Sequence, residues 1–277
     1  MIESDAAYDA EPLSQGDIFQ WQARTHGCNY GVIVTADCDI AFGKYGSHLT
    51  YVPVLTLHEY LATHFLPDKV RQAAFQVLSQ IVNSVWRLQQ ASRPEFSRKL
   101  SDEAMSIWLQ STDLASILSS LGVTDSSGKN TSKLEGLVAI WRELDERSSD
   151  STDAIGQIAA LARARDTSLA AIHKQVHSHV ISLPGDRMFL SSIDGSNQTG
   201  YVVMLRNMRE IEGNRIAVRP AQESSSAARR MSRLLSPYRY RLTQQLGEVF
   251  SSIGLPVPYE ESRVAVLSKS FNLVQES

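Results

Sequence analysis

The sequence predicts an α+β fold with a β-rich core, either a small barrel or a sheet, built from both ends of the chain. A long helical insertion interrupts this core, and a C-terminal helix follows it. Two observations predict this arrangement. Short runs rich in β-branched and aromatic residues, bounded by glycine, occupy residues 15–56 and return after residue 179, as strands do. Between them, over residues 57–178, the apolar residues change from a period of two to the period of a helix.

The first β-rich stretch follows an acidic lead-in, residues 1–14, and contains three predicted strands. They are GDIFQWQA (16–23), NYGVIVTADCDI (29–40) and HLTYVPVL (48–55). Three strands alone would be marginal in water. We therefore expect them to join the later strands in one core, with two independent domains, one helical and one β-rich, as the alternative.

The helical insertion begins with a short helix predicted over 56–66. Pro67 and Asp68 are expected to terminate this helix. A longer helix over 70–91 carries one apolar stripe at the spacing of a buried helix face, formed by Val70, Ala74, Val77, Ile81, Val85 and Leu88. Shorter helices are predicted at 103–109, 114–121, 134–144, 154–163 and 168–177. The insertion therefore covers residues 57–178.

The second β-rich stretch completes the predicted core, which consists of residues 15–56 and 179–277. Strands are predicted at 179–183, 188–193, 200–205 and 215–220. The last helix, 236–256, has the clearest ends in the chain. Ser236 is its expected N-cap, Pro237 occupies its first position, and Gly254 ends it.

The composition indicates a globular protein and argues against a disulfide-rich or membrane-spanning one. The chain has 277 residues, 43% of them hydrophobic and 21% charged, which is typical of a globular protein with a sizeable core. Its net charge of -3 gives no general attraction to nucleic acid or anionic lipid. Cys28 and Cys38 are too few for a disulfide framework. The acidic N-terminus is unlike a signal peptide, and no segment has the roughly 18 apolar residues of a membrane helix. We expect a cytoplasmic protein with no membrane contact.

Two aspartates near the end of the second predicted strand are candidate catalytic residues. Strand alternation places Asp37 and Asp39 on one face, about 7 Å apart at Cα, and Cys38 on the other. Such a pair can bind Mg²⁺ or raise one carboxyl pKa for acid–base catalysis, with Lys44 as a counter-charge. The alternative is a polar strand end that enters a glycine-containing turn.

Three histidines form a candidate metal site. His173 and His177 are four residues apart, so they share one face of a predicted helix, and His179 follows at the start of a predicted strand. Converging imidazoles are typical ligands of Zn²⁺. Histidines near a helix C-terminus are also favourable without a metal, because their charge complements the helix dipole.

Residues 201–245 contain nine arginines, no lysine and three glutamates. This stretch carries +6, so the remainder of the chain carries -9. The candidate phosphate-binding residues are Arg229, Arg230 and Arg233, which lie within one turn of a predicted helix, and Arg239 and Arg241, which flank Tyr240. Arginines interleaved with aromatic residues can bind a nucleic-acid backbone. They can equally pair with acidic groups of this chain or of a protein partner.

The first 40 residues of the predicted core resemble MazF/PemK-type toxins. The resemblance rests on QGDIF (15–19), GVIVTADCDI (31–40) and TYVPVLT (50–56). It implies an SH3-like barrel and the activity of a bacterial endoribonuclease that cleaves single-stranded RNA without a metal. Gly16, Asp17 and Ile18 match the first element, and Thr56 stands at the position of the catalytic threonine. The family's arginine falls where this chain has Asn29 or Tyr30, and Arg24 is the nearest arginine.

These observations favour three functions. The first is an interaction or regulatory module of a bacterial multi-gene system, toxin-like or defence-like, that binds a protein partner through the helical insertion. The second is a nuclease in which Asp37 and Asp39 act on single-stranded nucleic acid, with Mg²⁺ as a cofactor or by a toxin-like mechanism. The third is a protein with a structural Zn²⁺ site at His173, His177 and His179.

Overall fold

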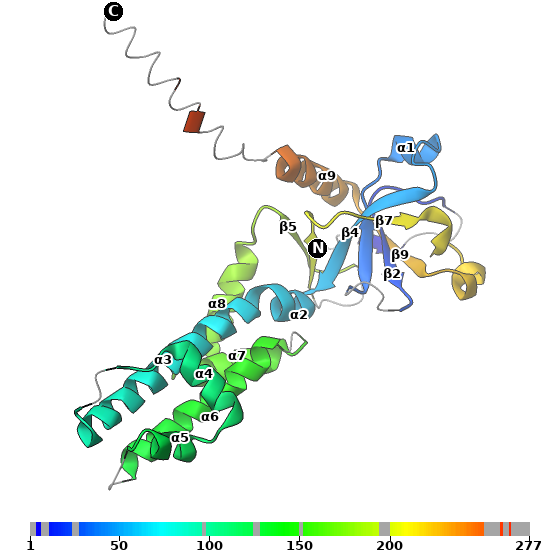
Figure 1. Ribbon diagram of the computed structural model, residues 1–277. Helices are drawn as coiled ribbons and strands as arrows, with labels where there is room; N and C mark the ends of the chain where they lie inside the picture. Colours follow the sequence, from blue (N-terminus) through cyan, green and yellow to red (C-terminus); the bar gives the residue numbers. More distant parts are fainter. Residues whose placement is uncertain are drawn as a thin grey trace, which may run out of the picture. The chain divides into compact units, whose positions relative to one another are not determined.

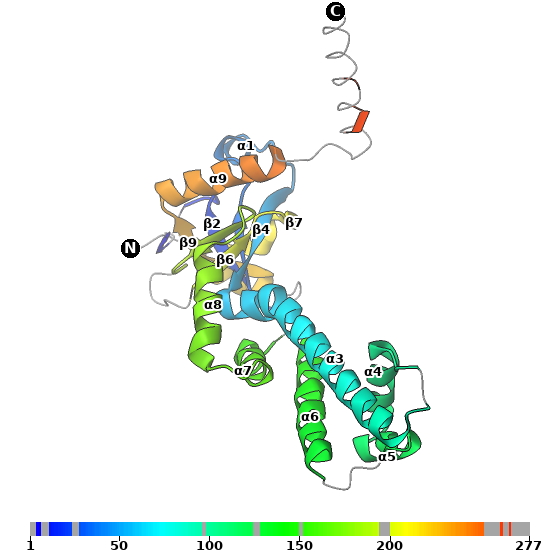
Figure 2. The ribbon, with the colours of Figure 1, turned by 90° about the vertical axis from the view of Figure 1, so that its left-hand side faces the viewer.

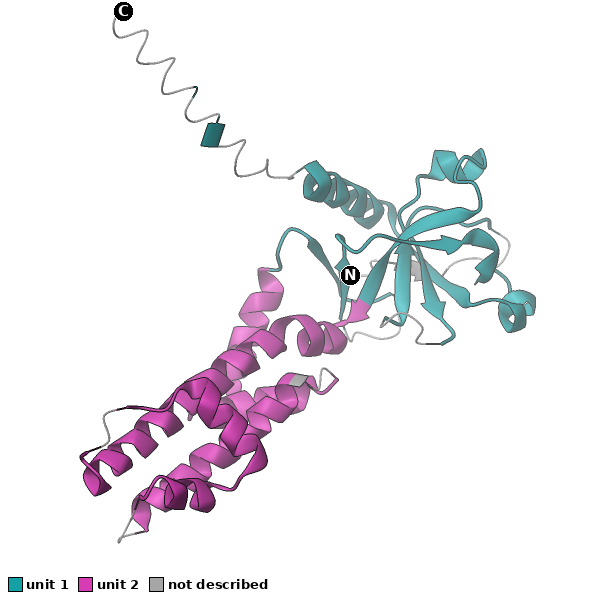
Figure 3. Cartoon of the chain, in the orientation of Figure 1, with its two compact units in different colours: residues 1–54, 183–277 teal, residues 55–182 magenta. Residues whose placement is uncertain are grey.

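The computed structural model confirms the mixed α+β class, with a sheet built from both ends of the chain and a helical insertion between them. It describes residues 4–6, 11–23, 28–95, 98–123, 128–149, 152–193, 200–251, 261–262 and 266. The chain divides into two compact units (Figure 3). Unit 1 comprises Met1–Val54 and Leu183–Ser277, and unit 2 comprises Leu55–Ser182.

Unit 1 contains a nine-stranded sheet whose order interleaves the two ends of the chain (Figure 1). The strands are β1 (Ser4–Ala6), β2 (Asp17–Trp21), β3 (Tyr30–Ile33), β4 (His48–Thr56), β5 (Arg187–Leu190), β6 (Tyr201–Met204), β7 (Arg209–Glu212), β8 (Ile216–Ala217) and β9 (Ala228–Leu234). The main path is β1-β9-β2-β3-β4-β6-β5, while β7 pairs with β4 and β8 with β9. This path is not closed, so the core takes the form of the predicted sheet rather than of a barrel.

The core of unit 1 lies on both sides of the sheet. One cluster contains Ile18, Val32, Val52, Leu190, Val203 and Leu234, and α9 (Ser236–Ser251), labelled in Figure 2, adds Leu242 to it. On the other side of β2, Phe19, Trp21 and Tyr51 meet edge to face, with ring centroids 5.1 to 5.9 Å apart. Alternation along β2 places Ile18 and Phe19 on opposite faces, so both faces bury apolar surface.

Gly31 of β3 is required by the aromatic cluster. A Cβ atom at this position would lie 2.5 Å from Cζ of Phe19 and 2.7 Å from Cδ2 of Tyr51. Since both rings are themselves buried, neither can move without disturbing the core. The two rings therefore pack directly against the backbone of β3, an approach that only glycine allows.

Unit 2 is helical. Its elements are α2 (Leu57–Tyr60), a π-helical turn (Leu61–Phe65), α3 (Leu66–Ser92), α4 (Asp102–Ser111), α5 (Leu114–Ser120), α6 (Lys129–Ser149), α7 (Ala154–Ala164) and α8 (Leu169–Ile181). The long helices α3 and α6 lie side by side, and α7 packs against both (Figure 2). The predicted stripe of α3 is buried at Val70, Ala74, Val77, Ile81 and Val85 and only partly buried at Leu88.

Short polar side chains start several of these helices. Ser101, Asp113, Asp153 and Ser168 precede α4, α5, α7 and α8, and each accepts a hydrogen bond from the backbone N–H three residues later. These bonds satisfy donors that a helix leaves free in its first turn. Glu143 of α6 also pairs with Arg147 and with Arg163 of α7. These two arginines, Arg163 first, lower the pKa of the Glu143 carboxyl.

Several sequence predictions of local structure are wrong. Pro67 does not end the helix, because the chain continues through the π-helical turn into α3 with the proline in its first turn, where a missing N–H is tolerated. Residues 179–181 extend α8 rather than forming a strand. Of 215–220, only Ile216–Ala217 is a strand. The predicted strand 29–40 ends at Ile33.

Three strands, β1, β7 and β9, lie outside the predicted ones. β1 falls in the predicted lead-in and pairs with β9, and β7 follows β6 and pairs with β4. The predicted end of the last helix, Gly254, and Arg24 lie outside the described residues.

Candidate functional site

The two candidate catalytic aspartates do not lie on a strand. Thr35 accepts a hydrogen bond from the backbone N–H of Thr50 through its hydroxyl, and after Ala36 the chain enters the five-residue helix α1 (Asp37–Ala41). Residues two apart on a helix point about 200° away from each other. Asp37 and Asp39 therefore do not share a face, and the predicted parallel arrangement of their carboxylates is wrong.

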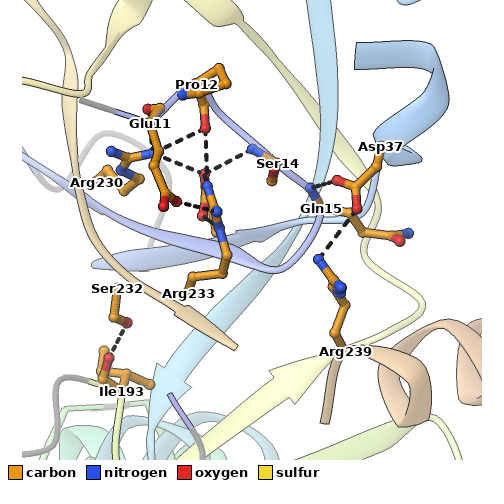
Figure 4. A network of polar contacts seen from close by, with 11 residues as sticks. Glu11, Pro12, Ser14, Gln15, Asp37, Ile193, Arg230, Ser232, Arg233 and Arg239 are labelled. Carbon is orange, nitrogen blue, oxygen red and sulfur yellow. Dashed lines mark hydrogen bonds and ion pairs between the residues drawn. The ribbon is translucent and has the colours of Figure 1, made fainter. Parts of the chain in front are cut away.

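Asp37 instead contacts the C-terminal helix (Figure 4). Its Oδ1 accepts a hydrogen bond from the backbone N–H of Gln15 at 2.7 Å, and its Oδ2 lies 3.3 Å from Nη1 of Arg239 on α9. The ammonium of Lys44 lies 5.4 Å from the ring of Phe42. Asp37 and the arginine-rich stretch thus meet, whereas neither Asp39 nor Lys44 forms a side-chain hydrogen bond or ion pair with Asp37 in the described part of the chain.

The predicted helix containing Arg229, Arg230 and Arg233 is instead strand β9. In the pairing of β9 with β2, Arg233 lies opposite Asp17 and Arg230 lies opposite Phe19. A step of three positions along β9 therefore matches a step of two along β2, so the register shifts by one residue between Ile18 and Phe19. Such a bulge reverses the alternation of the strand beyond it. Arg230 and Arg233, three positions apart, can therefore point to the same side.

Both arginines bind the buried carboxylate of Asp17, which is inaccessible to solvent. Arg233 Nε lies 2.6 Å from Oδ1, and Arg230 Nη1 lies 3.5 Å from Oδ2. Arg233 also pairs with Glu11 at 2.6 Å, and both guanidinium groups donate to the carbonyl of Pro12. These contacts raise the pKa of Arg233, with Asp17 as the main cause.

The arginine-rich stretch is therefore partly neutralised by acidic groups of the same unit. Arg229, on the opposite side of β9, donates to Gln20 at 3.2 Å and lies 4.0 Å from Glu223. Arg239 pairs with Asp37. Arg241 is exposed on α9 and has no hydrogen bond or ion pair among the described residues. Of the five candidate phosphate-binding arginines, it is the one that the described residues leave without an acidic neighbour.

All three candidate metal-binding histidines lie on α8. His173 and His177 are exposed, while His179 points about 200° away from His177 because it follows two residues later on the helix. The ring of His179 stacks on Phe65 at 3.9 Å between centroids, and its Nε2 lies 2.9 Å from the hydroxyl of Tyr60. Within the described ranges, no three or more His, Cys, Asp or Glu side chains are placed to hold a metal.

The partners of His179 come from the π-helical turn and the helices that flank it. Tyr60 ends α2, and Phe65 ends the turn. Two further side chains support this turn. Buried Gln157 of α7 donates to the carbonyl of Ala62 at 3.4 Å, and Thr63 donates through its hydroxyl to the carbonyl of Glu59 at 2.7 Å. π-Helical turns are rare and frequently occur at functional sites.

A groove opens beside this turn, between the start of α3 and one face of α8. Its volume is about 580 Å³, and it is lined by Phe65, Lys69, Ala171, Lys174, Gln175, Ser178, His179 and Ser182. We call it the α3–α8 groove. Two lining residues are lysines and none is acidic. The ammonium of Lys69 lies 5.9 Å from the ring of Phe65, and neither Lys69 nor Lys174 forms an ion pair in the part of the chain that the structure describes.

Burial and the nearby charge of Lys69 lower the pKa of His179 below its usual value. The imidazole is therefore neutral at neutral pH, so that the charge in the α3–α8 groove comes from the lysines. The sequence pattern indicates His179 but not Tyr60, Phe65, Lys69 or Lys174. A π-helical turn has no recognisable sequence pattern, and these side chains meet His179 only through the packing of the helices.

Comparison with known proteins gives no match to a family model, to a curated protein or to a solved structure. Within the described residues, no helix has both the length and the apolar character needed to span a bilayer.

Proposed function

We propose that this chain is an interaction module, and that its helical unit binds a protein partner in the α3–α8 groove. The observation that carries the proposal is the groove itself, an open and shallow basic surface beside a supported π-helical turn. Membership in a bacterial multi-gene system, which the toxin resemblance implies, belongs to the same proposal.

The construction of the groove supports this role. All of its lining side chains except that of Ser182 project from helical residues, and such sites hold their groups in fixed positions. Phe65 and His179 restrain each other by stacking, and Tyr60 holds the imidazole through its hydroxyl. A preorganised surface loses less side-chain entropy when a partner binds.

Site-specific photo-crosslinking tests the proposal. A photoreactive phenylalanine replaces exposed Gln175 in the groove or, as the control, exposed Glu135 of α6. Both proteins are expressed in the cells to which the chain is native, and irradiated adducts are identified by mass spectrometry. We expect a discrete protein adduct from position 175 and none from position 135. The same adducts from both positions, or none from position 175, would reject the proposal.

The second candidate function is a nuclease, and one contact favours it. Asp37 from α1 and Arg239 from α9 lie 3.3 Å apart, and exposed Arg241 follows on the same helix. A carboxylate beside arginines is an arrangement that can serve phosphodiester chemistry. The test is incubation of the purified protein with labelled single-stranded RNA and DNA, with and without Mg²⁺. Cleavage that Asp37→Asn abolishes would establish this function, and intact nucleic acid would remove it.

A further inference from the structure

We propose that the α3–α8 groove is a carboxylate-binding site that holds an acidic peptide segment of the protein partner. This inference rests on the function proposed above and specifies the chemistry of the partner at the same site.

The charge of the groove is the first argument. Lys69 and Lys174 line it from two different helices. Arg165 adds a third positive charge close by, because its guanidinium donates to the side chain of Gln175 at 3.1 Å. With no acidic side chain in the lining, these cations produce a local positive potential on a chain whose net charge is -3. Concave surfaces of one sign concentrate ligands of the other.

The hydrogen-bonding groups of the groove suit carboxylates. Ser178 and Gln175 line it as polar side chains, and ammonium groups on flexible stems can follow several carboxylate positions. Since Nε2 of His179 is close to the Tyr60 hydroxyl, Nδ1 is the polar atom of that ring that remains for a ligand. A neutral imidazole can donate or accept one such bond without adding charge.

The aromatic residues favour a peptide over a single-stranded nucleic acid. Nucleic-acid sites of this kind need aromatic faces on which bases stack. Here the ring of Phe65 stacks against His179 with an angle of 12° between planes, and the ammonium of Lys69 lies over Phe65. His179 thus already occupies one face of Phe65 and the ammonium of Lys69 lies over the ring, so the edge of Phe65 is left to contact an apolar side chain of a peptide.

Fluorescence anisotropy of a labelled hexaglutamate peptide, titrated with the full chain, tests this inference. We expect saturable binding that weakens with added salt. The double variant K69E/K174E should weaken binding by about tenfold or more, since each reversal replaces attraction with repulsion. K129E is the matched control, because Lys129 is an exposed lysine at the start of α6 and does not line the groove. It should change the affinity by less than about twofold.

Two results would overturn the inference. One is the absence of saturable hexaglutamate binding below about 1 mM, and the other is an equal loss of affinity in K129E and K69E/K174E. The circular dichroism of each variant shows whether it folds. If the peptide result is negative while the photo-crosslinked adduct from position 175 persists, the carboxylate inference fails and the interaction function stands. If that adduct is absent, the function itself fails.

Discussion

Replacing Asp17, the buried aspartate of β2, tests whether the arginines of β9 stabilise the sheet by pairing with its carboxylate. Asp17 is completely buried, and its carboxylate accepts a hydrogen bond from the backbone N–H of Ser14 at 2.9 Å besides the contacts with Arg230 and Arg233. Asp17→Asn keeps the shape but removes the charge. It removes the negative charge that the side chain of Arg230, which is 1% exposed, contacts at Oδ2 of Asp17.

Removing one member of a buried ion pair typically costs about 3–5 kcal/mol of unfolding free energy. Arg230 keeps the carbonyls of Glu11 and Pro12, and Arg233 keeps the carboxylate of Glu11. We therefore expect the lower end of that range, about 3 kcal/mol. The assay is native-state hydrogen exchange of β2 and β9 amides, which reports on the sheet separately from the helical unit.

Arg229→Gln is the control for Asp17→Asn. Arg229 lies on the same strand, but its side chain is 44% exposed and its nearest carboxylate is 4.0 Å away, so the expected cost is below about 0.5 kcal/mol. If Asp17→Asn costs less than about 1 kcal/mol, or no more than the control, the ion pairs do not hold β9 to β2. The arginines would then be free for another role.

Three further predictions concern stability. Gly31→Ala should destabilise unit 1 by about 1–3 kcal/mol through overpacking. Gly136→Ala lies at an exposed helix position with open space around its Cβ, so it should stabilise unit 2 by up to about 1 kcal/mol. Hydrogen exchange measures both effects. Thr56 and Glu59 form a capping box at the start of α2, so Thr56→Ala should cost about 1 kcal/mol in urea unfolding and Thr56→Ser much less. Because the pKa of His179 is lowered on folding, the unfolded state binds more protons, and unit 2 should lose stability as the pH falls from about 6.5 towards the lowered pKa. Melting curves of His179→Gln across this range should lack that loss.

Much of the fold could be predicted because local pattern and burial agree. The alternating run that forms β4 and the apolar stripe of α3 both lie where the sequence places them. The errors occur where tertiary contacts decide. The β-branched residues near His179 suit a strand, yet the Ser168 cap and the packing of α7 against α8 extend the helix through Ile181. The polar edge strand β7 carries too few apolar residues to be recognised.

The candidate sites depended even more on tertiary structure. The bulge in β9 brings Arg230 and Arg233 onto one buried carboxylate, and a single sequence contains no signal for it. The residues of the α3–α8 groove come from two segments that are about a hundred positions apart in the chain. They meet because the π-helical turn directs Phe65 towards His179. Sequence spacing identified the histidine, but only the packing of the helices identifies its partners.

Photo-crosslinking from position 175, compared between the otherwise unchanged chain and the K69E/K174E background, tests the central claim most directly. We predict a discrete partner adduct in the unchanged background, its loss when both lysines are reversed, and its retention in K129E. An adduct of equal yield in all three backgrounds would show that the charge of the groove does not select the partner. The absence of any adduct would contradict the claim that a protein binds there.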